Sequence, residues 1–286
     1  PYKNVVSLGH VLDKNGQKMS KSLGNTINPA DLLEKYGADA LRWYFYTIND
    51  PGSSKLFNET DVDLALKKFL LTFLNCWVFL KTYAPNVKAS SNLNNLPINV
   101  LDRWIVGCLA QTSIKTSDCL DKFDITGAAR IIENFTINDL SLWYVRRSRR
   151  RLQQPRNPAE FKEAAKIFSY VLLNLAKISA PFIPFLAEEI FQNLGGNNYQ
   201  KGKSVHLSKW PVSDKETINK LLAGGIVDQM QKVRQITAQV LAERAKRGIK
   251  VRQPLAKITL GKDMELDVEM RNLLAEEINV KIIEFD

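Results

Sequence analysis

Residues 61–83 read DVDLALKKFLLTFLNCWVFLKTY, and their apolar side chains recur every three or four positions. The recurring residues are Val62, Leu66, Phe69, Phe73, Trp77 and Leu80. This spacing gives an α-helix one continuous apolar face. The unbroken apolar part of the stretch is shorter than the roughly 20 residues that a membrane span needs, and Asn75 interrupts it. We therefore predict a helix that packs against other helices, and no membrane partner.

Four later stretches show the same periodicity, with capping and breaking residues at their limits. Asn157 followed by Pro158 is typical of a helix start, whereas Pro181 and the Gly195–Gly196 pair end helices. The predicted helices span residues 101–123, 125–152, 158–180 and 185–194. Long helices that each bury one face favour an up-and-down bundle. We predict a mainly α protein whose central domain, residues 57–196, is a helical bundle.

Shorter elements flank this bundle. Residues 1–56 are expected to hold a strand and, after the cap Asn28, two helices separated by Gly37. Residues 197–286 are expected to form a linker and a small α/β domain. The expected elements outside the bundle are a strand at 5–12, helices from 29 and over 38–48, an extended segment at 205–207, a polar helix at 214–246, strands at 258–260 and 280–285, and a helix at 267–278.

The charge and the cysteine and histidine content indicate which partners and which metal or disulfide sites this chain can have. The net charge of +10 favours a polyanionic partner, either nucleic acid or an acidic membrane surface. Three widely spaced cysteines and two histidines give neither a C-x-x-C pair nor a disulfide framework. We therefore expect no zinc or other metal site in this chain, and a reducing compartment. Its first residue, Pro1, is typical of a piece excised from a longer protein.

The segment 17–25, QKMSKSLGN, carries the candidate chemistry. Lys18 and Lys21 are compact, movable cations in a loop that Gly24 closes, and such cations suit a leaving pyrophosphate. Ser20 and Ser22 can donate hydrogen bonds to phosphate or to the loop. The segment is not a P-loop, since the pattern G-x-x-x-x-G-K is missing. From the residues alone, a solvated lysine-rich turn is the competing interpretation.

A longer match extends beyond this loop. The pentapeptide KMSKS (18–22), GHVLD (9–13) before it, and LGN (23–25) and YGADALR (36–42) after it resemble the class I aminoacyl-tRNA synthetases. The resemblance implies that Lys18, Met19, Ser20, Lys21 and Ser22 bind ATP, with Lys18 and Lys21 acting in amino acid activation. It also implies that Mg²⁺ accompanies the ATP and that the bundle binds the anticodon arm of a tRNA.

Downstream segments resemble the isoleucyl subgroup of these synthetases. They are WYVRRSRRR (143–151), SVHLSKWP (204–211) and GIKVRQPL (248–255), whereas APFIPF (180–185) is similar across the valyl, leucyl and methionyl subgroups as well. The implied partners are tRNA(Ile), ATP and isoleucine, in a cytoplasmic, monomeric enzyme. Alternatives are a valyl, leucyl or methionyl enzyme, or a stand-alone helical RNA-binding protein that retains the lysine loop.

The sequence also departs from the family pattern. The family's other ATP motif, histidine-x-glycine-histidine, has no match here, because Ser7–His10 lacks the first histidine and lies next to the lysine loop. The amino acid pocket, the editing domain and the cysteine zinc knuckle of many bacterial members have no counterpart either. We therefore expect this chain to be a C-terminal piece, from the lysine loop onward, that performs no aminoacylation alone.

Two basic stretches are candidates for RNA contact. Five arginines within residues 146–151 would repel one another unless an anion is near. The predicted tRNA-binding residues are Trp143, Arg147, Arg149, Arg150 and Arg151, although a helical aromatic such as Trp143 more often packs in a core. Helical geometry leaves two arrangements: the helix bends near residues 136–139, or Arg146 lies at a helix interface and pairs with a carboxylate such as Asp139. We expect the second, with Arg147, Arg150 and Arg151 facing solvent. The second stretch, residues 232–252, leaves a solvated face and RNA contact equally open.

Overall fold

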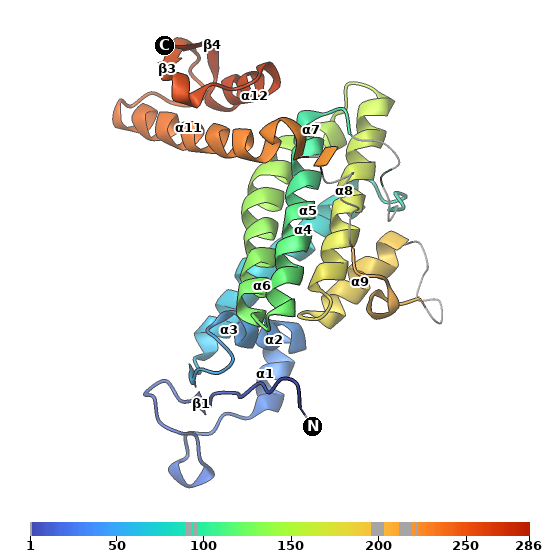
Figure 1. Cartoon of the computed structure of the whole chain (residues 1–286), viewed down its shortest axis with the longest axis vertical. Coiled ribbons are helices and arrows are strands. Elements are labelled where there is room, and N and C mark those ends of the chain that lie inside the picture. The colour runs from blue at the N-terminus through green and yellow to red at the C-terminus, as the bar shows by residue number, and fades with distance from the viewer. Residues whose placement is uncertain (1, 90–92, 94–96, 196–202, 212–218, 221) are drawn as a thin grey trace. The chain divides into compact units, whose positions relative to one another are not determined.

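The computed structural model describes residues 2–89, 93, 97–195, 203–211, 219–220 and 222–286 (Figure 1). Two compact units share the chain. Unit 1 comprises residues 1–95 and 108–213, and unit 2 comprises residues 96–107 and 214–286. The predicted tail (1–56) and most of the predicted bundle therefore lie together in unit 1. The predicted linker at 197–202 and the predicted helix start at 214 lie outside the described residues.

Unit 1 begins with a short parallel pair of strands, β1 (Val11–Leu12) and β2 (Lys55–Leu56). The expected strand over 5–12 is therefore wrong for residues 5–10. Gly9 lies so close to the backbone before β2 that a Cβ atom on residue 9 would be 2.2 Å from the Ser53 carbonyl oxygen. Only glycine fits this crossing without a shift of the backbone.

Two helices follow the strand, as predicted. Asn28 caps α1 (Pro29–Tyr36), its side chain accepting a hydrogen bond from the Ala30 amide, 3.2 Å away. Gly37, at φ 80°, ends this helix and precedes α2 (Ala38–Thr47). Helix α2 contributes Ala40, Trp43 and Tyr44 to the core of unit 1.

The helix predicted from residues 61–83 is continuous but not uniformly α-helical. It consists of α3 (Glu59–Ala65), a π-helical segment η2 (Leu66–Leu70) and α4 (Leu71–Tyr83). Val62, Phe69, Phe73, Trp77 and Leu80 are buried, so five of the six residues of the predicted stripe belong to the core, and Leu66 is half-buried.

The other predicted bundle helices are present. They are α5 (Val100–Asp121), α6 (Ile125–Asn134) with its continuation through η3 (Phe135–Val145) and α7 (Arg146–Gln153), α8 (Pro158–Ser179) and α9 (Pro184–Gly195). Helix α8 packs against α4, α6, α7 and α9, and Figure 1 shows α8 beside the continuous helix α6–η3–α7. Tyr144 and Phe168, both buried, meet edge to face across this contact.

The segment 203–211 lies on the bundle. Val205–Leu207 forms a 3-10 turn, η4, so the expected extended segment is wrong there. Glu188 of α9 explains the turn, because its carboxylate accepts hydrogen bonds from the Ser204 hydroxyl and the Val205 amide. Trp210 then donates its indole N–H to the Ser117 hydroxyl at 2.9 Å.

Unit 2 contains α11 (Ile226–Lys246), β3 (Leu255–Leu260), α12 (Val268–Ile278) and β4 (Val280–Phe285), after a turn, η5 (Ala223–Gly225). Gly224 and Gly225, both at positive φ, interrupt the helix predicted over 214–246. Residues 219, 220 and 222 before them are helical, and α11 starts after them at Ile226. Strands β3 and β4 pair in parallel, and α11 packs against α12. Met230, Val233, Met270, Leu274 and Ile278 form its core. The predicted strand–helix–strand pattern is confirmed.

Candidate functional site

The lysine loop, residues 17–25, is built around a polar link between its two ends. Asn25 donates its side-chain amide to the Asp13 carboxylate at 2.9 Å and accepts the Ser20 backbone N–H at 2.9 Å. The other Asp13 oxygen accepts the Asn15 and Gln17 amides. These hydrogen bonds favour the ionised carboxylate and hold the pKa of Asp13 below its usual value. Asp13 thus closes the turn before the loop and bonds that turn to Asn25, the last residue of the loop.

Within the loop, the second half of the pentapeptide forms a single 3-10 turn, η1 (Lys21–Leu23). Ser20 caps this turn, because its hydroxyl accepts the Leu23 amide and lies 3.0 Å from the Ser22 hydroxyl. Gly24 ends the turn at φ 65°, a left-handed conformation that favours glycine. The hydroxyls therefore organise the loop itself in this state.

Lys18 and Lys21 are exposed, and Met19 is half-buried. Lys18 pairs through its backbone with Leu12 in an antiparallel bridge, which fixes the start of the loop. Within the described part of the chain, neither lysine ammonium group has a hydrogen bond or an ion pair. Both cations are consequently available to an external anion, while Met19 anchors the loop by packing. This geometry suits two movable charges beside a polyphosphate.

Helix α2 follows the loop and is joined at its N-terminal end to the α8–α9 corner. The Asp39 carboxylate accepts the amides of Phe185 and Leu186, at 3.3 and 2.7 Å, and so caps α9 from another helix. Burial raises the pKa of Asp39, and these hydrogen bonds only partly oppose that effect. Arg42, one turn later, donates to the carbonyls of Pro181 and Phe182 at 2.8 and 3.0 Å. Two sequence motifs about 140 residues apart are therefore bonded to each other.

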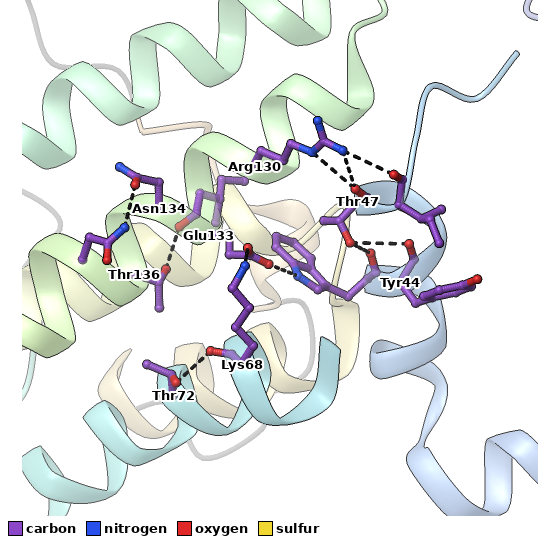
Figure 2. Close-up of polar contacts among 12 residues, drawn as sticks. Tyr44, Thr47, Lys68, Thr72, Arg130, Glu133, Asn134 and Thr136 are labelled. Atoms are coloured by element: carbon purple, nitrogen blue, oxygen red, sulfur yellow. Dashed lines mark hydrogen bonds and ion pairs between the residues drawn. The ribbon is translucent and has the colours of Figure 1, made fainter. Parts of the chain in front are cut away.

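The middle of α2 is joined to the bundle through Glu133 (Figure 2). Trp43, which is fully buried, donates its indole N–H to Glu133 at 3.2 Å, and the other Glu133 oxygen pairs with Lys68. The Trp43 ring stacks on Phe69 with centroids 3.7 Å apart. One carboxylate thus connects α2, η2 and α6.

The C-terminal end of α2 is capped by α6. Arg130 donates to the carbonyls of Thr47 and Ile48, as Figure 2 shows, and the Thr126 hydroxyl donates to the Asn49 carbonyl at 2.9 Å. Helix ends leave such carbonyls without intrahelical partners. We call the contacts of Asp39, Arg42, Trp43 and Arg130 together the α2 junction. Sequence reasoning quoted residues 36–42 as a motif but missed this role, because nothing local indicates partners so distant.

The arginine cluster lies on α7, but the arginines that face solvent are not all the predicted ones. Arg146, Arg149 and Arg150 are exposed, Arg147 is half-buried, and Arg151 is buried at 8% exposure. The predicted interface position of Arg146 and the predicted solvent-facing position of Arg151 are therefore both wrong. Val145, Ser148 and Leu152 are buried, as predicted. Trp143 is half-buried, with the Arg146 guanidinium 5.3 Å from its ring centroid.

The π-helical segment η3 explains this difference. A π-helix closes its turns with i→i+5 hydrogen bonds, so each turn holds more residues than an α-turn. Through η3 the buried face follows steps of four, from Ile132 to Thr136, Leu140, Tyr144 and Ser148, whereas Leu142 is 54% exposed. A straight α-helix would have continued the apolar stripe from Leu142 into Arg146.

Comparisons with known proteins agree with this architecture. The family model "Anticodon-binding domain of tRNA ligase" matches residues 102–260, which is more than half of the chain. The chain belongs to this anticodon-binding family of tRNA ligases. A second family model, "tRNA synthetases class I (I, L, M and V)", matches residues 1–56. The segment that carries the lysine loop is thus similar to the class I synthetases, and the mainly helical fold is confirmed.

Curated relatives include the isoleucine–tRNA ligase of Dehalococcoides mccartyi strain CBDB1, 42% identical over 99% of this chain and 28% of the relative. That of Thermus thermophilus is 36% identical over 98% of this chain and 27% of the relative. The chain therefore spans just over a quarter of the length of these relatives. A solved LeuRS–tRNA–LeuAMS complex from Agrobacterium radiobacter K84 has a similar fold, with a TM-score of 0.56 and 20% identity over 74% of this chain and 24% of that one.

Two negative findings complete the description. Among the residues that the structure describes, no helix has both the length and the apolar character needed to cross a membrane. The same residues contain no group of three or more histidine, cysteine, aspartate or glutamate side chains placed to hold a metal ion. The cysteines Cys76, Cys108 and Cys119 are free thiols.

Proposed function

We propose that this chain is part of an isoleucine–tRNA ligase and supplies its lysine loop and its tRNA-binding bundle. The observation that carries the proposal is the similarity to isoleucine–tRNA ligases over 99% of the chain, from the loop to the last strand. In the whole enzyme, the isoleucine carboxylate attacks the α-phosphorus of ATP, and pyrophosphate leaves. A tRNA(Ile) hydroxyl then attacks the adenylate carbonyl, forming an ester as AMP leaves. We propose a monomeric, cytoplasmic enzyme, with Mg²⁺ arriving with the ATP.

In this proposal, Lys18 and Lys21 stabilise the negative charge that develops on pyrophosphate as the α–β phosphoanhydride bond breaks. Both ammonium groups are exposed, and the loop that carries them is held by its own hydrogen bonds. Met19, Ser20 and Ser22 set the shape of the loop around the nucleotide. A charge needed only in the transition state raises the turnover rate more than it tightens substrate binding.

The test of the loop is Lys21→Ala in the full-length ligase. Loss of one such charge should lower kcat for isoleucine-dependent pyrophosphate exchange by roughly 100- to 1,000-fold. KM for isoleucine should change by less than about threefold. Lys14→Ala removes another exposed lysine, from the adjoining turn, and should leave both values near wild type. Equal losses in kcat and in isoleucine affinity would contradict the proposed role.

For tRNA, we propose that α7 contacts phosphates through Arg147, Arg149 and Arg150, with Trp143 beside them. Arg146 joins this set because it is exposed, and Arg151 leaves it because it is buried. Arg149→Ala combined with Arg150→Ala should weaken tRNA binding and lower the salt dependence of binding by about 0.7 to 0.9 per lost phosphate contact. The control is Lys122→Ala, in the turn before α6, because α6 begins about 35 Å from Arg149 along the axis of the continuous helix.

A further inference from the structure

A second basic surface lies in unit 2, where α11 ends and turns into β3. We call residues 246–252 the basic loop. Between Glu243 and Gln253 the chain carries five cations, Arg244, Lys246, Arg247, Lys250 and Arg252, and one carboxylate, so the segment has a net charge of +4. Glu243 is already engaged by Arg247 at 2.7 Å and by Lys246 at 3.9 Å. Lys250 and Arg252 are exposed, and no side chain of the described residues neutralises them.

A buried cation holds the base of this loop. Arg244 is only 3% exposed, and its guanidinium donates to four backbone carbonyls. The acceptors are the carbonyl oxygens of Lys250, Gln253, Ile278 and Asn279, at 2.8 to 3.2 Å. No acidic side chain of the described residues forms an ion pair with Arg244. The four carbonyls accept from its two terminal nitrogens, and its Nε is buried without a hydrogen-bond partner among the described residues. Carbonyl dipoles do not cancel its charge, so it adds to the positive potential of the loop.

The backbone of the loop is oriented by these contacts. The carbonyls of Lys250 and Gln253 point inward to Arg244, and the carbonyl of Val251 accepts the Asn279 side-chain amide at 2.9 Å. Within the described part of the chain, the backbone N–H groups of Lys250, Val251 and Arg252 have no acceptor. Successive N–H groups in a turn can bind an anion, and the Gln253 amide donates to the Lys250 carbonyl in such a turn. Buried charge, exposed charge and backbone dipoles therefore all have the same sign here.

We propose that the basic loop is a second RNA contact that binds the phosphodiester backbone without reading bases. The inference rests on the proposed function, since tRNA is the polyanion that the rest of the chain is proposed to bind. Lysine and backbone N–H groups recognise phosphate oxygens and carry no base information. A membrane surface fits less well, because Val251 is the only large apolar side chain exposed in the loop, and one such side chain adds little insertion energy.

The experiment compares two charge-matched double variants of this chain. Lys250→Ala with Arg252→Ala removes two cations from the loop. Lys232→Ala with Lys262→Ala removes two cations elsewhere in unit 2, with Lys232 about 21 Å from Lys246 along α11. Binding of a tRNA(Ile) transcript and of an unrelated tRNA transcript is measured by fluorescence anisotropy across a salt series. Unchanged unfolding temperatures establish that both variants are folded.

The loop variant should bind both tRNAs about 10- to 50-fold more weakly and lower the salt slope by about 1.4 to 1.8, with the control within about twofold of wild type. Loss for one tRNA only would overturn backbone recognition. Wild-type affinity of the loop variant, with weakening by Arg149→Ala/Arg150→Ala, would overturn this inference and leave the proposed function standing. Absence of tRNA binding in the wild-type chain would count against both. Loss of binding to phosphatidylglycerol vesicles, with RNA binding intact, would instead assign the loop to a membrane.

Discussion

The lysine loop and the α2 junction are neighbours in the sequence, yet they are held in opposite ways. Every side-chain hydrogen bond of the loop reaches at most 12 residues along the chain, and most are exposed. At the junction, Asp39, Arg42 and Trp43 reach partners 90 to 147 residues away, and Asp39 and Trp43 are buried. Short-range, solvated bonds break at low cost, whereas buried long-range bonds do not.

The lysine loop and the α2 junction also differ in how firmly they are attached to the bundle. The loop ends at Asn25, and α2 begins 13 residues later at Ala38 (38 − 25). The loop, which we propose closes on a nucleotide, thus precedes a helix that is bonded to the bundle at both ends. On this proposal, mobility is confined to the part that would meet the nucleotide. The comparison predicts large stability effects at the junction and small, local ones in the loop.

The largest effect on stability is expected from Glu133→Ala. It removes the acceptor of the buried Trp43 indole N–H and the partner of Lys68, and we expect it to lower the free energy of unfolding by about 3 kcal/mol. Glu133→Gln keeps an acceptor for Trp43 and should recover most of that loss, because Lys68 is half exposed and its ion pair contributes little. Urea unfolding measures both variants. A decrease in the free energy of unfolding below about 1 kcal/mol for Glu133→Ala would mean that the junction contributes no more to stability than the loop does.

Asp39→Ala should have the next largest effect, about 2 kcal/mol, since it leaves the Phe185 and Leu186 amides of α9 without their cap. Hydrogen exchange should localise the change to the first turn of α9. Asp121→Ala, at the end of α5, removes an exposed aspartate from the same unit and is the control. Unaltered exchange at the start of α9 would show that this cap is dispensable.

In the loop, Asn25→Ala should lower global stability by less than about 1 kcal/mol, because its hydrogen bonds are partly solvated. The Ser20 amide should nevertheless exchange faster, since its acceptor is gone. Asn25→Asp should perturb the loop more than alanine does, because it sets a second carboxylate against Asp13, whose carboxylate lies 2.9 Å from the Asn25 side chain. Equal exchange rates in wild type and in both variants would show that the Asn25 hydrogen bonds do not hold the loop.

The smallest effect concerns pH, and its sign differs between the two regions. Burial raises the pKa of Asp39 above 3.8, so the folded state binds this proton more tightly and stability falls as pH rises from 3.8 through the raised pKa. Hydrogen bonds lower the pKa of Asp13, so its contribution is present above 3.8 and is lost as pH falls through the lowered pKa. Unfolding of Asp39→Asn and Asp13→Asn between about pH 3 and 6 should give difference curves of opposite slope. Slopes of the same sign would refute this contrast.

Local sequence signals were enough to predict most elements of this chain. The helix periodicity, the caps Asn28 and Asn157, and the stops at Gly37 and Pro181 depend on residues within one or two turns, so the helices appear where they were predicted. Prediction was wrong where a neighbour decided the conformation. Glu188 accepts the Val205 amide where residues 205–207 form a turn, and only Val11 and Leu12 of the expected strand 5–12 pair as a β-strand.

The sequence by itself determined the bundle, the lysine loop and the positive character of two surfaces, because composition and short-range spacing are local properties. Only the tertiary structure decided which arginines meet solvent, since the π-helical turns of η3 shift the phase of every residue after Asn134. It alone paired Asp39 with α9 and Glu133 with Trp43. It also placed Arg244 beneath the basic loop, where four carbonyls surround it. Such partners meet only when distant segments pack, and no local pattern encodes that distance.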